Sequence, residues 1–430
     1  MMSAEGIAFI LAILYLFFST ARHESTSISG ITMSRSLISL SSSLANAWPV
    51  KRSTIIRSLW CGYDNRLKFS SSGRYEDPIL PISRSHLNRF STTKAEDESF
   101  YESTVKSALV MGSKMLIEGG AFEPELSACH LLSHVLQLQV SNGFYHMLQI
   151  LENDKFAREI ANREVTNSQM TIYKEFLQRR LKHEPIQYII EEWDFYDFTL
   201  KCRAPVLCPR PETEELVEWV KEHIRQKIKN PSQNFRILDV GCGTGAIGLA
   251  LARLFPQASV LAIDLSPEAV ALSTENAKIL NLLDDVLGST RYQAILSSAS
   301  SFKLDDDEPG FDFVVSNPPY IPPADMHTLT ADVIEYESYD ALCGGESSDG
   351  LDVVRDIINQ LPEWTRRSVL GTGDLFMEVD PTQPIILQKS LGVCVDELAK
   401  SKSNVCFVQR RNDFNGKERF VRLKVQQWDK

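Results

Sequence analysis

The stretch ILDVGCGTGAIGLALA, residues 237–252, joins a β-prone apolar run to an apolar helical pattern through closely spaced glycines. Glycine permits backbone conformations and a close approach of a ligand that other residues prevent, and the amino end of a helix favours nucleotide-like groups. Strand-like and helix-like segments then alternate along the chain, which is typical of a doubly wound parallel sheet. The sequence therefore predicts an α/β, Rossmann-like fold with a ligand at this glycine loop.

The rest of the chain divides by pattern. Strands are expected at 236–240, 259–264, 311–315, 375–379, 405–409 and 419–425, with helices at 246–255, 268–280 and 350–361. These belong to a ligand-binding domain at 211–430. Apolar residues at helical spacing predict a small N-terminal helical bundle at 96–184, and alternation predicts a linking hairpin at 185–210.

Residues 1–95 have a different composition. An apolar run at 7–18 is followed, from Met33, by a segment rich in Ser and Arg and poor in acids. That composition is typical of an organellar transit peptide, and a disordered extension without an address is the alternative. We expect a disordered leader that is removed on import into mitochondria, or into another organelle such as a plastid. Translation starts at Met1 or Met33, and no stable membrane span is expected in the mature protein.

Composition excludes some classes of function. The net charge of −11 over 430 residues argues against a general nucleic-acid binder, whose binding surface would be basic. The eight cysteines form no CxxC pair or framework spacing, so reduced thiols in an intracellular compartment are expected. His130 and His134 stand at i, i+4 spacing without a third ligand, and we interpret them as ordinary helix residues. No metal site is expected.

A second motif follows the predicted strand in FDFVVSNPPYI, residues 311–321. Pro318 and Pro319 fix φ and remove two backbone donors, so the carbonyls near Asn317 and Pro318 remain free acceptors. Two acceptors on a stiff turn match the two donors of a primary amide, and the ring of Tyr320 suits its flat face. The sequence thus predicts a corner that receives hydrogen-bond donors.

The glycine loop alone does not identify its ligand. Gly243, Gly245 and Gly248 also satisfy the dinucleotide fingerprint, and Asp264, at the end of the next strand, could bind ribose hydroxyls in either case. Asp239, just before the first glycine, could accept from a cationic amino-acid group but would repel a pyrophosphate. A dehydrogenase also has no use for the NPPY corner. Both features favour a compact cationic nucleoside over NAD.

Together, DVGCGTG, Asp264 and NPPY resemble the S-adenosylmethionine-dependent methyltransferases that modify planar amino or amide nitrogens. PRPETEELVE at 209–218 and YESYDALCGGESSDGLD at 336–352 narrow the resemblance to the release-factor glutamine methyltransferase (HemK) family, and EEWDF and FMEVDP suggest its mitochondrial branch. The resemblance covers about residues 100–425. It implies a class I methyltransferase sheet, a helical substrate-recognition domain, and methylation of the glutamine in the Gly-Gly-Gln loop of an organellar peptide-chain release factor.

The resemblance also assigns residues. It implies that S-adenosylmethionine is bound by Asp239, Gly241, Cys242, Gly243, Thr244, Gly245, Asp264 and Asn317. It implies that the substrate amide meets Asn317, Pro318, Pro319 and Tyr320, with Asn317, Pro318 and Tyr320 catalytic. Phe195 or Tyr196, from the hairpin, is expected to close the other side of the amide. We interpret Glu212 and Thr213 as helix-capping residues and assign no role to Arg210.

The sequence departs from the family pattern at two places. The region expected near the adenine, 300–302 within SSASSFKL, lacks the usual acidic or amide residue followed by an aromatic or apolar one. Ser338 stands where the family commonly has Pro, a change expected to be tolerated in a surface loop.

NPPY also occurs in adenine-N6 methyltransferases of DNA or RNA, but those enzymes normally carry a basic and aromatic recognition region. A non-catalytic assembly factor on the same fold is the other alternative, and the intact glycine and NPPY motifs argue against it.

Overall fold

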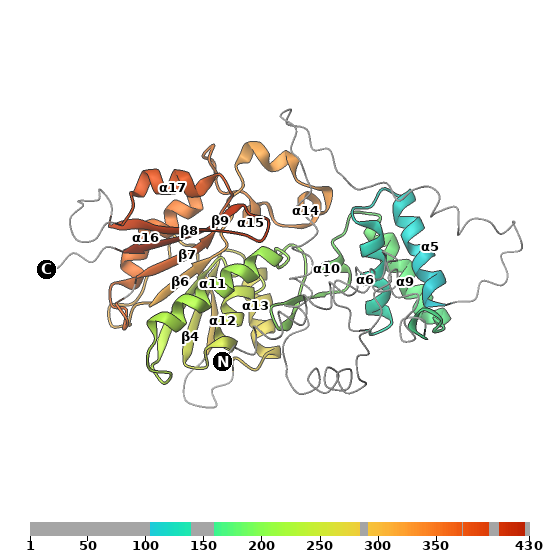
Figure 1. Cartoon of the computed structure of the whole chain (residues 1–430), viewed down its shortest axis with the longest axis horizontal. Helices are drawn as coiled ribbons and strands as arrows, with labels where there is room; N and C mark the ends of the chain where they lie inside the picture. Colours follow the sequence, from blue (N-terminus) through green and yellow to red (C-terminus); the bar gives the residue numbers. More distant parts are fainter. Residues whose placement is uncertain (1–103, 139–158, 284–290, 372, 395–403, 426–430) are drawn as a thin grey trace, which may run out of the picture. The chain divides into compact units, whose positions relative to one another are not determined.

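The computed structural model describes residues 104–138, 159–283, 291–371, 373–394 and 404–425 (Figure 1). The expected leader, 1–95, lies outside the described residues. Among the residues that are described, we find no helix both long and apolar enough to span a membrane.

The first described elements are helices that bury their apolar faces against one another: α5 (Val105–Glu118), α6 (Pro124–Val135) and α9 (Asn167–Arg180). Thr104 and Thr166 each form a capping box, which explains where α5 and α9 begin. The buried Tyr173 hydroxyl donates to the carbonyl of Ala128 at 3.2 Å and so ties α9 to α6. A short helix and an antiparallel hairpin follow, α10 (Ile186–Ile189), β1 (Glu192–Phe195) and β2 (Phe198–Lys201).

The remaining strands form one seven-stranded sheet in the order β5-β4-β3-β6-β7-β9-β8. Their bounds are β3 (Phe235–Val240), β4 (Ala258–Asp264), β5 (Tyr292–Leu296), β6 (Phe313–Ser316), β7 (Asp374–Glu378), β8 (Val405–Asn412) and β9 (Glu418–Val425). The strand β5 was missing from the sequence-based expectation, and β6 starts two residues later than expected.

The expected doubly wound parallel sheet is confirmed for five strands, but its edge at β9 and β8 is antiparallel. The first five strands are parallel, whereas β9 runs antiparallel to both β7 and β8. A short turn at 413–417 joins β8 to β9, and it contains Asn415-Gly416, a pair typical of hairpin turns. Strands joined by so short a turn can only pair antiparallel.

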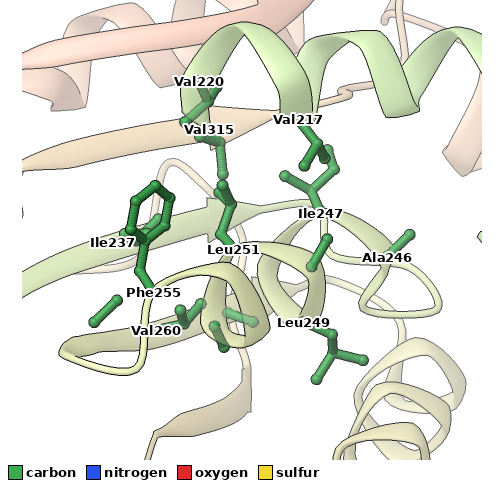
Figure 2. Packing of buried hydrophobic residues seen from close by; sticks show 14 of the residues in the cluster. Val217, Val220, Ile237, Ala246, Ile247, Leu249, Leu251, Phe255, Val260 and Val315 are labelled. Carbon is green, nitrogen blue, oxygen red and sulfur yellow. The ribbon is translucent and has the colours of Figure 1, made fainter. Parts of the chain in front are cut away.

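Helices cover both faces of the sheet. One face packs on α11 (Pro211–Lys227), α12 (Ala246–Leu254) and part of α13 (Pro267–Ile279), and the other on α16 (Asp352–Thr365) and α17 (Gln383–Leu391). Alternate residues of β3 face opposite layers, because Ile237 lies in the first cluster and Leu238 in the second. Figure 2 shows side chains of the first layer, among them Val217 and Val220 of α11, Ile247 and Leu251 of α12, and Val315 of β6.

The strand order places the site. From β3 the chain moves outward to β4 and β5, then crosses to the other side of β3 and continues with β6 and β7. The carboxyl ends of β3 and β6 therefore lie side by side at the point where the strand order reverses. In open α/β sheets ligands bind at this topological switch point. The glycine loop follows β3 directly and NPPY follows β6 directly.

The cysteine expectation needs one correction. Cys394 and Cys406 form a disulfide with their Cα atoms 5.2 Å apart, whereas five other described cysteines are free and buried. A β-bridge between Val393 and Phe407 brings the two thiols together. A spacing of twelve residues carries no framework signal, so the sequence alone did not indicate this pair.

Candidate active site

The backbone of the glycine loop, at 241–245, lies at the topological switch point between β3 and β6 and is exposed at Gly241. Gly241, Gly243 and Gly245 all have positive φ, of 71°, 53° and 85°. No atom lies within 4 Å of the position that a Cβ would take at Gly241, so the missing side chain leaves free space there. Cys242 and Thr244 are buried. The groups that these two residues present to a ligand are therefore their backbone N–H and C=O groups.

Asp264 ends β4 and faces the same loop. Its Oδ2 accepts from the backbone N–H of Gly243 and its Oδ1 from that of Ser266, both at 2.9 Å. Burial raises the pKa of this carboxyl, and the backbone hydrogen bonds oppose the rise. The side chain is only partly buried, so it is available to hydroxyl groups beside the glycine loop.

Asp239, near the end of β3, is buried beneath the glycine loop. Its side chain has no exposed surface, and its Oδ2 accepts from the N–H of Gly248, at 2.9 Å, beneath the loop. Burial raises its pKa to about 7. The sequence placed this carboxyl just before the first glycine, as an acceptor for a cationic amino-acid group, and the structure shows that it is buried there. Its Oδ1 has no hydrogen-bond partner among the described residues, so this corner retains one acceptor that a donor from a bound group would satisfy.

These features fit S-adenosylmethionine. The open loop accommodates a group pressed against the backbone, and the two carboxyls supply hydrogen-bond acceptors for the donors of a nucleoside and its amino-acid group. The region expected near the adenine is less suitable. Phe302 is buried against Phe311 and Trp364, with ring centroids 6.3 and 6.0 Å apart, so its ring belongs to the core.

The NPPY corner forms the second half of the site. The side-chain nitrogen of Asn317 donates to the hydroxyl of Thr213 at 3.1 Å. Its side-chain oxygen and the carbonyl of Pro318 receive no hydrogen bond from any described residue. Tyr320 is half-buried, and its hydroxyl donates to Glu378 at 3.3 Å. The two acceptors that the sequence predicted, the Asn317 side-chain oxygen and the Pro318 carbonyl, are therefore both free. The Tyr320 hydroxyl is fixed by its hydrogen bond to Glu378.

A long loop supports this corner from behind. Ile321 exchanges backbone hydrogen bonds with the end of α15 (Tyr339–Leu342) and the segment that follows it, donating to Leu342 at 3.0 Å and accepting from Gly344 at 2.9 Å. Gly350 has φ of 64°, and a Cβ there would collide with the carbonyl of Tyr320. This explains why the motif at 336–352 accompanies NPPY, since its glycines allow the two loops to touch. Two short helices complete the region, η1 (Pro323–Thr328) and α14 (Ala331–Tyr336).

The PRPETE segment begins α11 with Glu212 in the first turn, as expected, but Thr213 has a different role from the one the sequence suggested. Thr213 forms no cap, since no side chain caps α11; its hydroxyl donates to Glu378 at 2.8 Å instead. Arg210 donates to Glu337 at 2.6 Å, and the other oxygen of Glu337 accepts from the N–H of Cys208. Ser338 donates its backbone N–H to Pro205 at 2.9 Å, a bond that a Pro at this position could not make.

The hairpin aromatics are not part of this corner. Phe195 is 1% exposed and packs in the core against Phe198, so the expectation that it closes over a substrate amide is wrong. The hydroxyl of Tyr196 donates to Glu218 on α11, and Lys221 lies over its ring. Strand alternation explains the error: Phe195 occupies the inward position of β1, which sequence alone did not distinguish.

Glu378 and Gln383 are two further functional candidates, which the sequence analysis did not identify. Glu378, at the end of β7, accepts from both Thr213 and Tyr320. Gln383, at the start of α17, donates to the carbonyls of Tyr320 and Asp349, both at 2.8 Å. The motif FMEVDP contains Glu378, but nothing in its spacing points to the NPPY corner. No group of three or more His, Cys, Asp or Glu within the described ranges is arranged to hold a metal ion.

Comparisons with known proteins agree with this geometry. Residues 107–190 match the model of the PrmC N-terminal domain, and residues 221–345 match that of the methyltransferase small domain. The human MTRF1L release factor glutamine methyltransferase is 36% identical over 263 residues, which cover 60% of this chain and 73% of that protein. The release factor glutamine methyltransferase of Deinococcus radiodurans is 32% identical over 321 residues, which cover 74% of this chain and 98% of that protein.

Several further bacterial relatives carry the same name, among them the protein of Thermodesulfovibrio yellowstonii, 37% identical over 239 residues, 56% of this chain and 79% of that protein. The motifs at both strand ends, the seven-stranded sheet and these identities point in one direction. The chain belongs to the release factor glutamine methyltransferase family, whose members are S-adenosylmethionine-dependent enzymes with the class I methyltransferase fold.

Proposed function

We propose that this protein transfers a methyl group from S-adenosylmethionine to the side-chain amide nitrogen of the glutamine in the Gly-Gly-Gln loop of an organellar peptide-chain release factor. The observation that carries the proposal is the NPPY corner, where the side-chain oxygen of Asn317 and the carbonyl of Pro318 are both free to accept. The names of the relatives support the release factor as substrate.

The chemistry requires accurate positioning. A glutamine amide nitrogen is a poor nucleophile because its lone pair is delocalised into the carbonyl. If Asn317 and Pro318 accept its two N–H groups, the nitrogen is held in one orientation and its developing positive charge is stabilised. Tyr320 would pack against the flat amide. When bound, S-adenosylmethionine supplies an electrophilic methyl on a sulfonium centre.

The cofactor side of the proposal rests on the glycine corner. Gly241 to Gly245 would border the cofactor through their backbone, and Asp264 would accept from its ribose hydroxyls. Asp239 would act from beneath the loop through its unpartnered oxygen. A ligand rich in hydrogen-bond donors suits a corner with two carboxyls, whereas a pyrophosphate offers them only acceptors.

We further propose that the segment at 96–184 recognises the release factor and that the protein works in mitochondria. The first proposal is supported by the match of residues 107–190 to the PrmC N-terminal domain, and the second by the Ser- and Arg-rich, acid-poor leader. Fusion of residues 1–95 to a fluorescent reporter tests the address. Mitochondrial fluorescence is expected, and plastid or cytosolic signal would contradict it.

The enzymatic test uses the purified protein, a mitochondrial release factor and S-adenosylmethionine labelled in its methyl group. Label is expected on the loop glutamine, located by mass spectrometry of the released peptide. The control substrate is the same release factor with that Gln replaced by Asn, which should remain unlabelled because the shorter side chain does not reach the corner. Label on the control, or on adenine of DNA offered in parallel, would contradict the proposed substrate.

A further inference from the structure

Three side chains from distant parts of the chain meet below the NPPY corner. Thr213 lies in the first turn of α11, Asn317 follows β6 and Glu378 ends β7. Thr213 and Glu378 are 4% and 2% exposed, so water does not compete for their hydrogen bonds. The side-chain nitrogen of Asn317 contacts the Thr213 hydroxyl at 3.1 Å, and that hydroxyl contacts Glu378 at 2.8 Å.

We propose that Thr213 and Glu378 are positioning residues that set which way the Asn317 amide faces, so that its oxygen and not its nitrogen meets the substrate. This inference rests on the proposed function, because it concerns how the same corner receives a substrate amide.

The direction follows from counting protons. An ionised carboxylate can only accept, so the single proton of the Thr213 hydroxyl is committed to Glu378. The Thr213 oxygen then has only lone pairs left for Asn317, and only the NH₂ end of the amide can satisfy them. Turning the amide over would set its oxygen against the Thr213 oxygen with no proton between them. The planar amide moves as a unit, so its oxygen is directed away from Thr213.

Glu378 also controls the second member of the corner. Its other oxygen accepts from the hydroxyl of Tyr320 at 3.3 Å. Gln383 adds a donor to the backbone carbonyl of Tyr320 at 2.8 Å. One buried carboxylate thus orients the amide acceptor and holds the aromatic ring beside it.

The arrangement depends on the charge of Glu378. The pKa of Glu378 is raised to about 7, chiefly by burial and also by the charge of Glu212 on α11. The hydrogen bond from Thr213, the charge of Arg419 on β9 and the hydrogen bond from Tyr320 all lower it. A protonated Glu378 has a proton of its own to donate to Thr213, and the direction of the Asn317 amide is then no longer determined. Methyl transfer should therefore fall as the pH drops through about 7.

The experiment compares kcat and KM for the release factor in three variants. Thr213→Val keeps the shape and removes the acceptor, and it should lower kcat about tenfold or more, the size expected for one misoriented hydrogen bond. Thr213→Ser restores the hydroxyl and should recover most of the activity. Thr365→Val is the matched control, because Thr365 is also buried and its hydroxyl donates to a carbonyl of its own helix, that of Leu361. Cofactor affinity and Tm, measured in each variant, report whether the fold is intact.

The dependence of kcat on pH distinguishes a positioning role from a merely structural one, because a structural role would not change it. The wild type should lose kcat as the pH falls from 8 to 6, whereas Glu378→Gln, which cannot ionise, should lose clearly less over this range. Wild-type kcat in Thr213→Val, equal impairment in Thr213→Ser, or an unchanged acid limb in Glu378→Gln would overturn the inference.

A last measurement needs no substrate, so it separates this inference from the proposed function. The side-chain amide protons of Asn317, followed by NMR at pH 8, should exchange with solvent about tenfold faster in Thr213→Val than in the wild type. Equal exchange rates would overturn the inference by themselves. Failure of the wild type to methylate any release factor, with the exchange difference present, would overturn only the proposed substrate.

Discussion

The two corners of the site lie at neighbouring strand ends but are built in different ways. The glycine corner is made mostly by one continuous stretch, 239–248, with a single carboxyl, Asp264, from the next strand. The amide corner depends on Thr213, Asn317 and Glu378, which belong to three elements far apart in the chain. A corner built from backbone tolerates the loss of one side chain better than one in which each side chain orients the next.

The largest effect is expected at the amide corner. Asn317→Ala should lower kcat for methyl transfer by about 100- to 1000-fold, or about 3–4 kcal/mol, because it removes an acceptor aimed at the reacting nitrogen. The affinity for S-adenosylmethionine, measured by calorimetry, should remain nearly unchanged. Asn412→Ala, at an exposed position on β8, is the control. An equal loss of cofactor affinity would show that the two corners do not act separately.

Both corners bury an acid whose pKa is raised to about 7, Asp239 in one and Glu378 in the other. A raised pKa means that the folded protein holds the proton more tightly, so stability falls as the pH rises from the ordinary value toward the raised one. For Glu378, a rise from 4.5 to about 7 corresponds to about 3 kcal/mol lost across that window.

Urea unfolding at several pH values checks this expectation. Glu378→Gln should remove the decline in the free energy of unfolding that Glu378 causes between pH 4.5 and 7. Asp239→Asn should remove the decline that Asp239 causes, which begins nearer pH 3.8. If both variants keep the wild-type slope, neither acid is neutral in the folded protein. A change in only one of them would sharpen the contrast between the corners.

A smaller effect concerns packing beneath the glycine loop. A Cβ at Gly248 would lie 2.8 Å from Oδ2 of Asp239 and 2.9 Å from the ring of Tyr292. Both neighbours are fully buried, so Gly248→Ala should cost about 2 kcal/mol of stability by overpacking. Thermal unfolding measures this cost. A Tm equal to that of the wild type would mean that the glycine corner is more deformable than its contacts indicate.

The smallest expected effect is at Asp264. Asp264→Ala should weaken binding of S-adenosylmethionine about tenfold, or about 1.4 kcal/mol, through lost hydrogen bonds to hydroxyl groups. At saturating cofactor, kcat should change little, because the backbone of the glycine loop remains. Glu268→Ala, nearby on α13 and exposed, is the matched control. Unchanged affinity would remove Asp264 from the binding site and leave the backbone alone in that role.

The sequence was informative where structure is local, and less so elsewhere. The glycine loop, the β3–α12 unit and the proline corner could all be predicted, because each depends on residues within a few positions of one another. The strand β5 and the Cys394–Cys406 disulfide could not, because each depends on which distant segment becomes a neighbour. Phe195 was misassigned for the same reason, since only packing determines which face of its hairpin is buried. The antiparallel edge was missed although a local turn signal, Asn415-Gly416, lies between its two strands.

By itself, the sequence determined the fold class, the family and the two strand ends that carry the site. It did so because glycine and proline restrict or free the backbone wherever they occur, whatever surrounds them. Only the tertiary structure decided that Asp239 lies beneath the loop and that Thr213 contacts Asn317 and Glu378 instead of capping a helix. The direction of a side-chain hydrogen bond depends on partners brought together from 104 and 165 residues away, and on their burial, neither of which is encoded in local spacing.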